Sequence, residues 1–177
     1  MHRRDDSRHL HCMPDLFQYR LTIYQGFTMN EEKFWQLIEQ IDREALEDGD
    51  ADAAVEPLTE ALAELPVNDI KGFEECLAQA LYKLDGKVFA DHAGNSGKSD
   101  DGFLYARCFV VGSGKTTYDS VLADPTLMPD QTDDWLEELL SVAAEAWSEK
   151  TGRDTDDWEF TASVDYETGS NSAAWPG

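Results

Sequence analysis

The chain has 177 residues, 41% of them hydrophobic, and its 37 acidic residues against 14 basic ones give a formal net charge of −23. A chain of this length can fold around one core without a disulfide or a metal ion, and its apolar content is too high for a disordered acidic tail. Because a negative surface repels phosphate groups, the charge argues against nucleic acids and anionic membranes as partners.

The cysteine pattern and the hydropathy of the sequence predict the cellular compartment. Cys12, Cys76 and Cys108 show no C-x-x-C spacing, and their odd number argues against a disulfide framework. The sequence has no apolar run of about 18 residues and no apolar segment typical of a signal peptide. We therefore expect a soluble protein of the reducing cytoplasm.

Residues 1–28 differ in composition from the rest of the chain. They hold four arginines against three aspartates, a formal charge of +1, which leaves 34 acidic and 10 basic residues, or −24, for residues 29–177. This shift at Met29 predicts that residues 1–28 are a non-native or disordered extension and that Met29 is the true start. The alternative is a basic arm with metal ligands at His9, His11 and Cys12, an incomplete set for a four-coordinate zinc site.

Apolar residues at helical spacing predict three helices in the first half of the domain. Asn30 is the expected cap of a helix over residues 31–47, with acidic residues in its first turn. A connector over residues 48–52 leads to a second helix that ends at Pro66. Asn68 is the expected cap of a third helix that continues to about Asp85.

The second half is predicted as shorter helices followed by a tail. A single turn is expected after Val88, residues 103–111 fit either a helix or a buried strand, and a short helix ends before Pro125. Thr132 is the expected cap of a last long helix that stops at Gly152. The sequence thus predicts an all-α fold, a compact bundle of about five to six helices over residues 29–152. An extended, acidic and aromatic-containing C-terminal tail is expected over residues 153–177, with a few of its aromatic side chains laid on the helical body.

Three sequence patterns approach known functional motifs without completing them. Residues 112–117 (GSGKTT) resemble a phosphate-binding loop, but Phe109 stands where the first glycine is required, so a glycine stop between helices is favoured. Residues 48–59 begin like a calcium loop but have Ala53 at the glycine position. His92 is the only histidine outside the extension, so a nucleophilic triad has little support. No catalytic residue, metal site or cofactor is therefore predicted.

A set of segments in fixed order resembles a bacterial family of domains of unknown function, family 4240. These segments are Phe34-Trp35, Ser99-Asp100-Asp101-Gly102-Phe103 with Arg107 beyond it, Leu122-Ala123-Asp124-Pro125, and residues 142–152. The resemblance covers about residues 29–152 and is consistent with a start at Met29. It implies a helical domain and brings no activity with it.

The Ser-Asp-Asp-x-Phe pattern of the resemblance marks the candidate ligand or partner site. Its residues are Trp35, Asp100, Asp101, Phe103 and Arg107. A structural explanation is favoured, in which Ser99 caps a helix, the two aspartates occupy its first turn, and Arg107 pairs with an acid from another helix.

The leading functional hypothesis is a non-catalytic interaction or regulatory domain, for instance of the immunity type, whose acidic surface binds a basic partner protein. The alternative is a small hydrolase or ligand-binding enzyme with an acidic site around Asp100 and Asp101, with or without a divalent cation. A mimic of nucleic acid is a third hypothesis, which requires carboxylates spaced like phosphates. The sequence does not identify the partner, the substrate or the oligomeric state.

Overall fold

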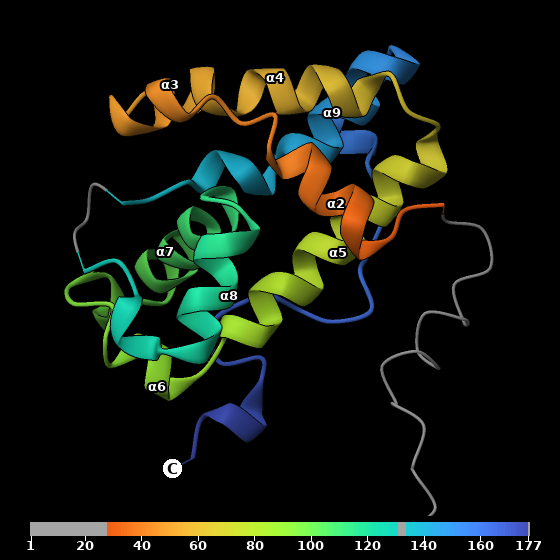
Figure 1. Ribbon diagram of the computed structural model, residues 1–177. Helices are drawn as coiled ribbons and strands as arrows, with labels where there is room; N and C mark the ends of the chain where they lie inside the picture. The colour runs from red at the N-terminus through yellow and green to blue at the C-terminus, as the bar shows by residue number, and fades with distance from the viewer. Residues whose placement is uncertain (1–27, 131–133, 177) are drawn as a thin grey trace, which may run out of the picture.

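The computed structural model describes residues 28–130 and 134–176, and within these ranges it contains helices and no strands, which confirms the all-α class (Figure 1). The α-helices of the described residues are α2 (Glu31–Ile38), α3 (Arg43–Glu47), α4 (Ala51–Ala63), α5 (Val67–Leu84), α6 (Lys87–Ala90), α7 (Asp100–Gly112), α8 (Lys115–Ala123) and α9 (Val142–Thr151). Short 3-10 turns join them, namely η1 (Ser96–Lys98), η2 (Pro125–Leu127), η3 (Glu137–Leu140), η4 (Thr155–Asp157) and η5 (Ser172–Ala174).

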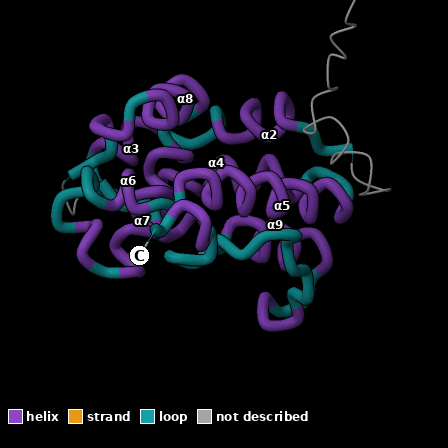
Figure 2. Tube along the Cα trace, turned by 90° about the horizontal axis from the view of Figure 1, so that it is seen from below, coloured by secondary structure: helices purple, strands orange, loops and turns teal. Residues whose placement is uncertain are grey.

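Helix α5 is the centre of the fold. It contacts α2, α4, α7 and α9, and the two views agree that these helices surround it (Figures 1 and 2). Its apolar residues recur at helical spacing and are fully buried, as the sequence predicts for Ile70, Phe73, Leu77, Leu81 and Leu84. Most of the remaining helices bury residues against this helix or against its neighbours, whereas α3 has only partly buried residues.

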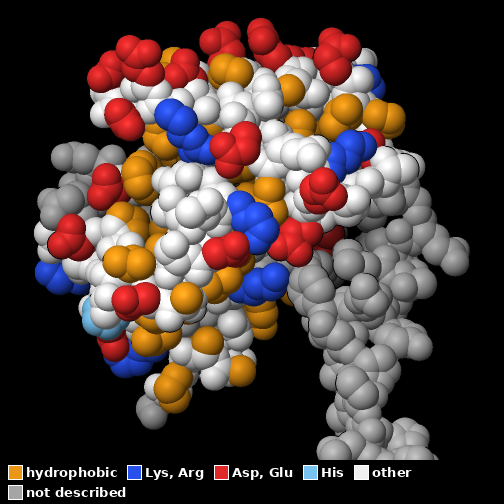
Figure 3. Space-filling view, viewed as in Figure 1, with side chains coloured by type: hydrophobic (Ala, Val, Ile, Leu, Met, Phe, Trp, Pro, Cys, Tyr) orange, Lys and Arg blue, Asp and Glu red, His pale blue; other side chains and the backbone are white. Residues whose placement is uncertain are grey.

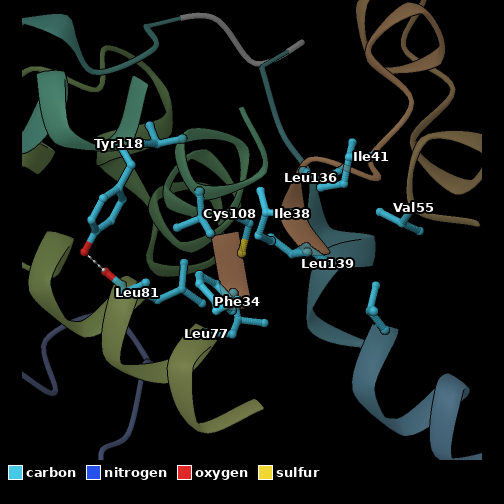
Figure 4. Packing of buried hydrophobic residues seen from close by; sticks show 14 of the residues in the cluster. Phe34, Ile38, Ile41, Val55, Leu77, Leu81, Cys108, Tyr118, Leu136 and Leu139 are labelled. Carbon is cyan, nitrogen blue, oxygen red and sulfur yellow. Dashed lines mark hydrogen bonds between the residues drawn. The ribbon is translucent and has the colours of Figure 1, made fainter. Parts of the chain in front are cut away.

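The hydrophobic core continues from α5 into both halves of the molecule. Phe34 and Ile38 of α2 point toward Leu77 of α5 and Cys108 of α7 (Figure 4). Tyr118 of α8 is buried as well, and its hydroxyl donates a hydrogen bond of 3.1 Å to the Ala80 carbonyl of α5. This bond satisfies the one polar atom of a large buried side chain.

The first predicted helix is wrong as a single element, because the chain turns at residues 39–42 between α2 and α3. The backbone N–H of Asp42 donates to the Ala54 carbonyl of α4 at 2.9 Å, and the Asp42 carboxylate caps α3. Asp42 thus leaves the helical path to make a contact with a distant element. Asn30 is confirmed as the cap of α2, since its side chain accepts from Lys33 N at 2.8 Å.

Two other predicted helix starts are also wrong. Asn68 does not cap the third predicted helix, because α5 already begins at Val67. Pro66 occupies the cap position, and Asp69 N donates to the Pro66 carbonyl at 2.7 Å. The last helix does not run from Thr132, which lies outside the described residues. Leu136 N instead donates to the Tyr105 carbonyl of α7 at 3.3 Å, and α9 starts only at Val142. The predicted stop at Gly152 is confirmed by its left-handed backbone, with φ of 68°.

Residues 103–111, which fit helix or strand, belong to α7. The run is almost entirely apolar because α7 is buried on most of its circumference by α5, α8 and the turns beside it.

The predicted number of helices is too low. The first predicted helix is divided into α2 and α3, and the single turn expected around Val88 is helix α6. Residues 153–157 are exposed, whereas the later part of the predicted tail runs back over α5 and α7 and packs aromatic residues on them.

Several ionisable side chains lie inside this helical body. Five are buried around α5, namely Asp69, Glu74, Glu75, Asp85 and Arg107. Burial, followed by repulsion from the Glu75 carboxylate, raises the pKa of Glu74 to about 7. Burial likewise lowers the pKa of the Arg107 guanidinium from its usual range. Ionised side chains are costly in such surroundings unless a partner compensates them.

Replacement of Gly97 by alanine tests how closely η1 packs on α6. A Cβ at Gly97 would lie 2.0 Å from the Ala90 carbonyl oxygen, a backbone atom that cannot move aside. We expect Gly97→Ala to lower the free energy of unfolding by about 2–3 kcal/mol in urea titrations. Gly49→Ala is the control, because Gly49 has a φ of 77° and an open surrounding, and backbone strain alone costs about 1 kcal/mol. Equal losses would contradict the packing argument.

Replacement of Glu74 by glutamine tests its pKa. The folded-state pKa exceeds the unfolded value of 4.5, so the folded state binds the proton more tightly and loses stability as the pH rises from about 4.5 to 7. Glu74→Gln therefore stabilises the protein at pH 8 by up to about 3 kcal/mol and changes little at pH 4.5. Unfolding in urea at both pH values measures this difference. The exposed Glu64→Gln is the control, and a gain independent of pH would refute the explanation.

Candidate functional site

Acidic side chains gather along the edge of the molecule that α3 and α4 form (Figure 3). Beside this edge, α4 and α9 enclose a groove of about 480 Å³. It is lined by Asp50, Asp52, Ala53, Val55, Glu56, Thr59, Glu60, Glu138, Ser141, Glu145 and Glu149. Seven of these eleven residues are acidic and none is Lys or Arg, so the groove is strongly negative.

The amphipathic pattern of α4 places acids in this groove. Ala54, Leu58 and Leu62 are fully buried against the core. Residues 52, 56 and 60 follow at intervals of four, so these three acids share one face of the helix. Residues 138, 145 and 149 bring three more glutamates from η3 and α9 to the same groove.

The groove carboxylates have no cationic partner within the described part of the chain, where no ion pair involves any of them. Lys150, at the end of α9 and next to Glu149 in sequence, donates from its ammonium group to the Ala63 carbonyl at 3.1 Å. Like charges four residues apart on one helix repel each other. A cationic ligand would relieve this repulsion.

A larger hollow of about 920 Å³ lies between α3 and α7, with Arg43, Glu47 and Phe109 among its lining residues. Arg43 is engaged with the protein itself, since it donates to the Gly112 carbonyl and lies near Glu39. The rim of the hollow at Asp134 adjoins residues outside the described ranges.

The sequence-predicted site residues fall into different surroundings. Asp100 and Asp101 are exposed in the first turn of α7, where the Ser99 hydroxyl caps the helix by accepting from Gly102 N at 3.2 Å. Trp35 is buried on α2 against the Tyr118 ring, at a centroid distance of 4.9 Å. No hydrogen bond or ion pair among the described residues joins Trp35 to Asp100, Asp101 or Arg107.

Arg107 does not form the predicted ion pair with an acid of another helix. It is fully buried, and its guanidinium donates to the carbonyls of Leu81 and Tyr166 and to the Thr168 hydroxyl, each at 3.0 Å. Its planar group also lies 4.9 Å from the centre of the Phe103 ring. The reason is geometric, because the C-terminal segment (residues 158–175) covers Arg107 and supplies neutral acceptors.

Asp85 is a central contact of the C-terminal segment, and the sequence interpretation missed it. Its fully buried carboxylate accepts from Gly169 N at 3.0 Å, Asn171 N at 2.8 Å and Trp175 Nε1 at 2.9 Å. The sequence does hold a signal for the segment that reaches it. Apolar or small residues alternate with polar ones from Trp158 to Thr168, which is typical of a half-buried extended chain.

The incomplete motifs of the sequence have structural roles. Asp50, in the calcium-like pattern, caps α4 by accepting from Ala53 N at 3.2 Å. Gly112 ends α7 and Gly114 precedes α8, so the phosphate-loop-like pattern is a stop between two helices, and Lys115 pairs with Asp119 at 2.7 Å. Across residues 28–130 and 134–176, no group of three or more His, Cys, Asp or Glu side chains is placed to hold a metal ion.

In the same ranges, none of the helices has the length and apolar character that a bilayer crossing requires.

The comparisons with known proteins point to one family. No curated protein and no solved structure is detectably similar to the chain. The sequence model of the family described as "Protein of unknown function (DUF4240)" matches residues 29–149, which include α2 to α8 and most of α9. Because the match covers more than half of the sequence, the chain belongs to the DUF4240 family.

Proposed function

We propose that the chain is a non-catalytic interaction module that binds a basic segment of a partner protein in the acidic groove between α4 and α9. The observation that carries this proposal is the lining of the groove, with seven carboxylates and no base. A regulatory or immunity-type role is the form of function that fits such a module best.

The partner should present Lys or Arg side chains on an extended or helical segment. Each such side chain exchanges water for carboxylate acceptors, and charge-assisted hydrogen bonds are about twice as strong as neutral ones. The long-range field of a chain with net charge −23 also accelerates the encounter with a basic protein. Phosphate-bearing ligands meet repulsion at the same surface.

A hydrolase around Asp100 and Asp101 has weaker support. Both side chains are exposed at the start of α7, while Arg107 is buried under the C-terminal segment and Trp35 lies against α8. A catalytic site requires groups that converge on one substrate. The acidic groove is the stronger basis for a function.

Neutralisation of the groove tests the proposal with a defined probe, a fluorescent 12-residue peptide of alternating Lys and Ala. We expect the triple variant Glu56→Gln, Glu60→Gln, Glu145→Gln to bind the peptide at least tenfold more weakly in fluorescence anisotropy. The affinity of the wild-type chain should fall steeply between 50 and 300 mM salt, because screening weakens charge attraction.

A matched triple variant separates the groove from the overall charge. Glu44, Asp101 and Glu159 are exposed and lie outside the groove, so their replacement by Gln, Asn and Gln gives the same net charge. We expect this control to bind within twofold of the wild-type chain. Equal losses in both variants would mean that the peptide senses only the net charge, and the proposed groove would be rejected.

A further inference from the structure

The surface formed by Leu81, Asp85, Phe103 and Arg107, here the α5–α7 face, has the composition of a peptide-binding site. It offers a carboxylate for N–H groups, a guanidinium for carbonyl groups and an aromatic ring. All four residues are fully buried, and the C-terminal segment contacts Asp85, Phe103 and Arg107. Such a combination can hold an extended main chain through its own polar groups.

The C-terminal segment is held largely through its backbone. Asp85 accepts from the backbone N–H groups of Gly169 and Asn171, and Arg107 donates to the Tyr166 carbonyl. Glu75 of α5 likewise accepts from Ser163 N at 2.8 Å. These contacts do not depend on the identity of the bound residues, so another chain of the same shape can make them.

Two side chains of the segment add specificity. The Trp175 ring meets the Phe103 ring edge to face, with centroids 5.9 Å apart, while its indole N–H donates to Asp85. The Thr168 hydroxyl accepts from Arg107 at 3.0 Å and donates to the Asp100 carbonyl at 2.8 Å. The recognised pattern is therefore a hydroxyl residue, a glycine turn and a tryptophan.

The receptor and its occupant belong to different parts of the sequence. The α5–α7 face lies inside the stretch that matches the family, residues 29–149, whereas the C-terminal segment lies wholly beyond it. The family domain thus carries a set of buried polar groups whose partners come from outside its own boundaries. Residues 151–157, which lead to the segment, are all exposed.

One donor of the buried guanidinium is unused. Within residues 28–130 and 134–176, the buried Nε atom of Arg107 has no hydrogen-bond partner. A buried guanidinium normally has all its donors satisfied, and each exception costs free energy. With the C-terminal segment in place, the α5–α7 face thus keeps one unsatisfied donor.

From these observations we propose that the α5–α7 face is a peptide-binding site, filled in this chain by residues 158–175 as an intramolecular ligand. A partner protein's extended segment with the same pattern, a hydroxyl residue, a glycine turn and a tryptophan, replaces it. This site is distinct from the acidic groove, because the two share no lining residue.

The test uses the full chain with a specific protease site inserted between Arg153 and Asp154, in the exposed stretch after α9. After cleavage of the folded protein, a fluorescent peptide of residues 154–176 is added. We expect the cut protein to keep its helical circular dichroism and to take up the peptide. The uncut protein should bind it at least twentyfold more weakly, because its own segment competes at a high effective concentration.

Variants of the peptide leave the receptor unchanged and define the pattern. Trp175→Ala and Thr168→Val in the peptide should each weaken uptake at least fivefold, whereas Glu159→Gln, at an exposed position, should not. In the protein, Asp85→Asn should weaken uptake at least tenfold. Asp91→Asn is its control, since Asp91 is exposed and pairs with Lys87.

Two results would overturn the proposal. If the cut protein loses its helical signal, the segment is part of the core and not a ligand. If the cut protein stays folded but binds a scrambled peptide as tightly as the native one, the face does not recognise the pattern. Both results are read independently of whether the acidic groove binds the peptide of alternating Lys and Ala.

Discussion

The acids of α5 and of its C-terminal end are the constraint on which the rest of the structure depends. Asp69, Glu75 and Asp85 are buried, and a buried carboxylate is tolerated only when donors reach it. Those donors come from both ends of the described chain: Thr28 and Lys33 reach Asp69, Ser163 reaches Glu75, and residues 169–175 reach Asp85. The central helix thus fixes the path of distant segments through its charges as well as through its apolar stripe.

Two sets of acidic residues have opposite effects on stability. Asp69, Glu75 and Asp85 accept hydrogen bonds from the chain itself and contribute to one defined structure. In the groove between α4 and α9 the carboxylates repel one another, and among the described residues no ion pair compensates them, although Asp50 also caps α4. A protein that keeps such an arrangement loses some stability to self-repulsion. Binding of a cationic partner would recover that loss, which makes the groove a better candidate for function than for folding.

The sequence predicts the helical class and most helices, because burial of one face imposes a period of 3.6 residues. The sequence fails to predict a helix boundary where a contact between distant residues sets that boundary. This is so at Asp42, whose N–H bonds to the Ala54 carbonyl, and at Leu136, whose N–H bonds to the Tyr105 carbonyl. The candidate site was likewise predicted only in part. Ser99 is the expected cap, but the role of Arg107 depends on Tyr166 and Thr168, about 60 residues further along the chain. No local pattern around Arg107 carries that information.

Helix α9 is the element that the groove and the C-terminal segment have in common. Glu145 and Glu149 line the groove, while Trp147, between them in sequence, packs on Trp158 at the start of the segment, with ring centroids 5.7 Å apart. The two sides of one helix thus face the two proposed ligands. Thermodynamic linkage makes any coupling between the two ligands reciprocal, so a basic partner would change the hold on the segment by the same factor by which the segment changes the partner's affinity.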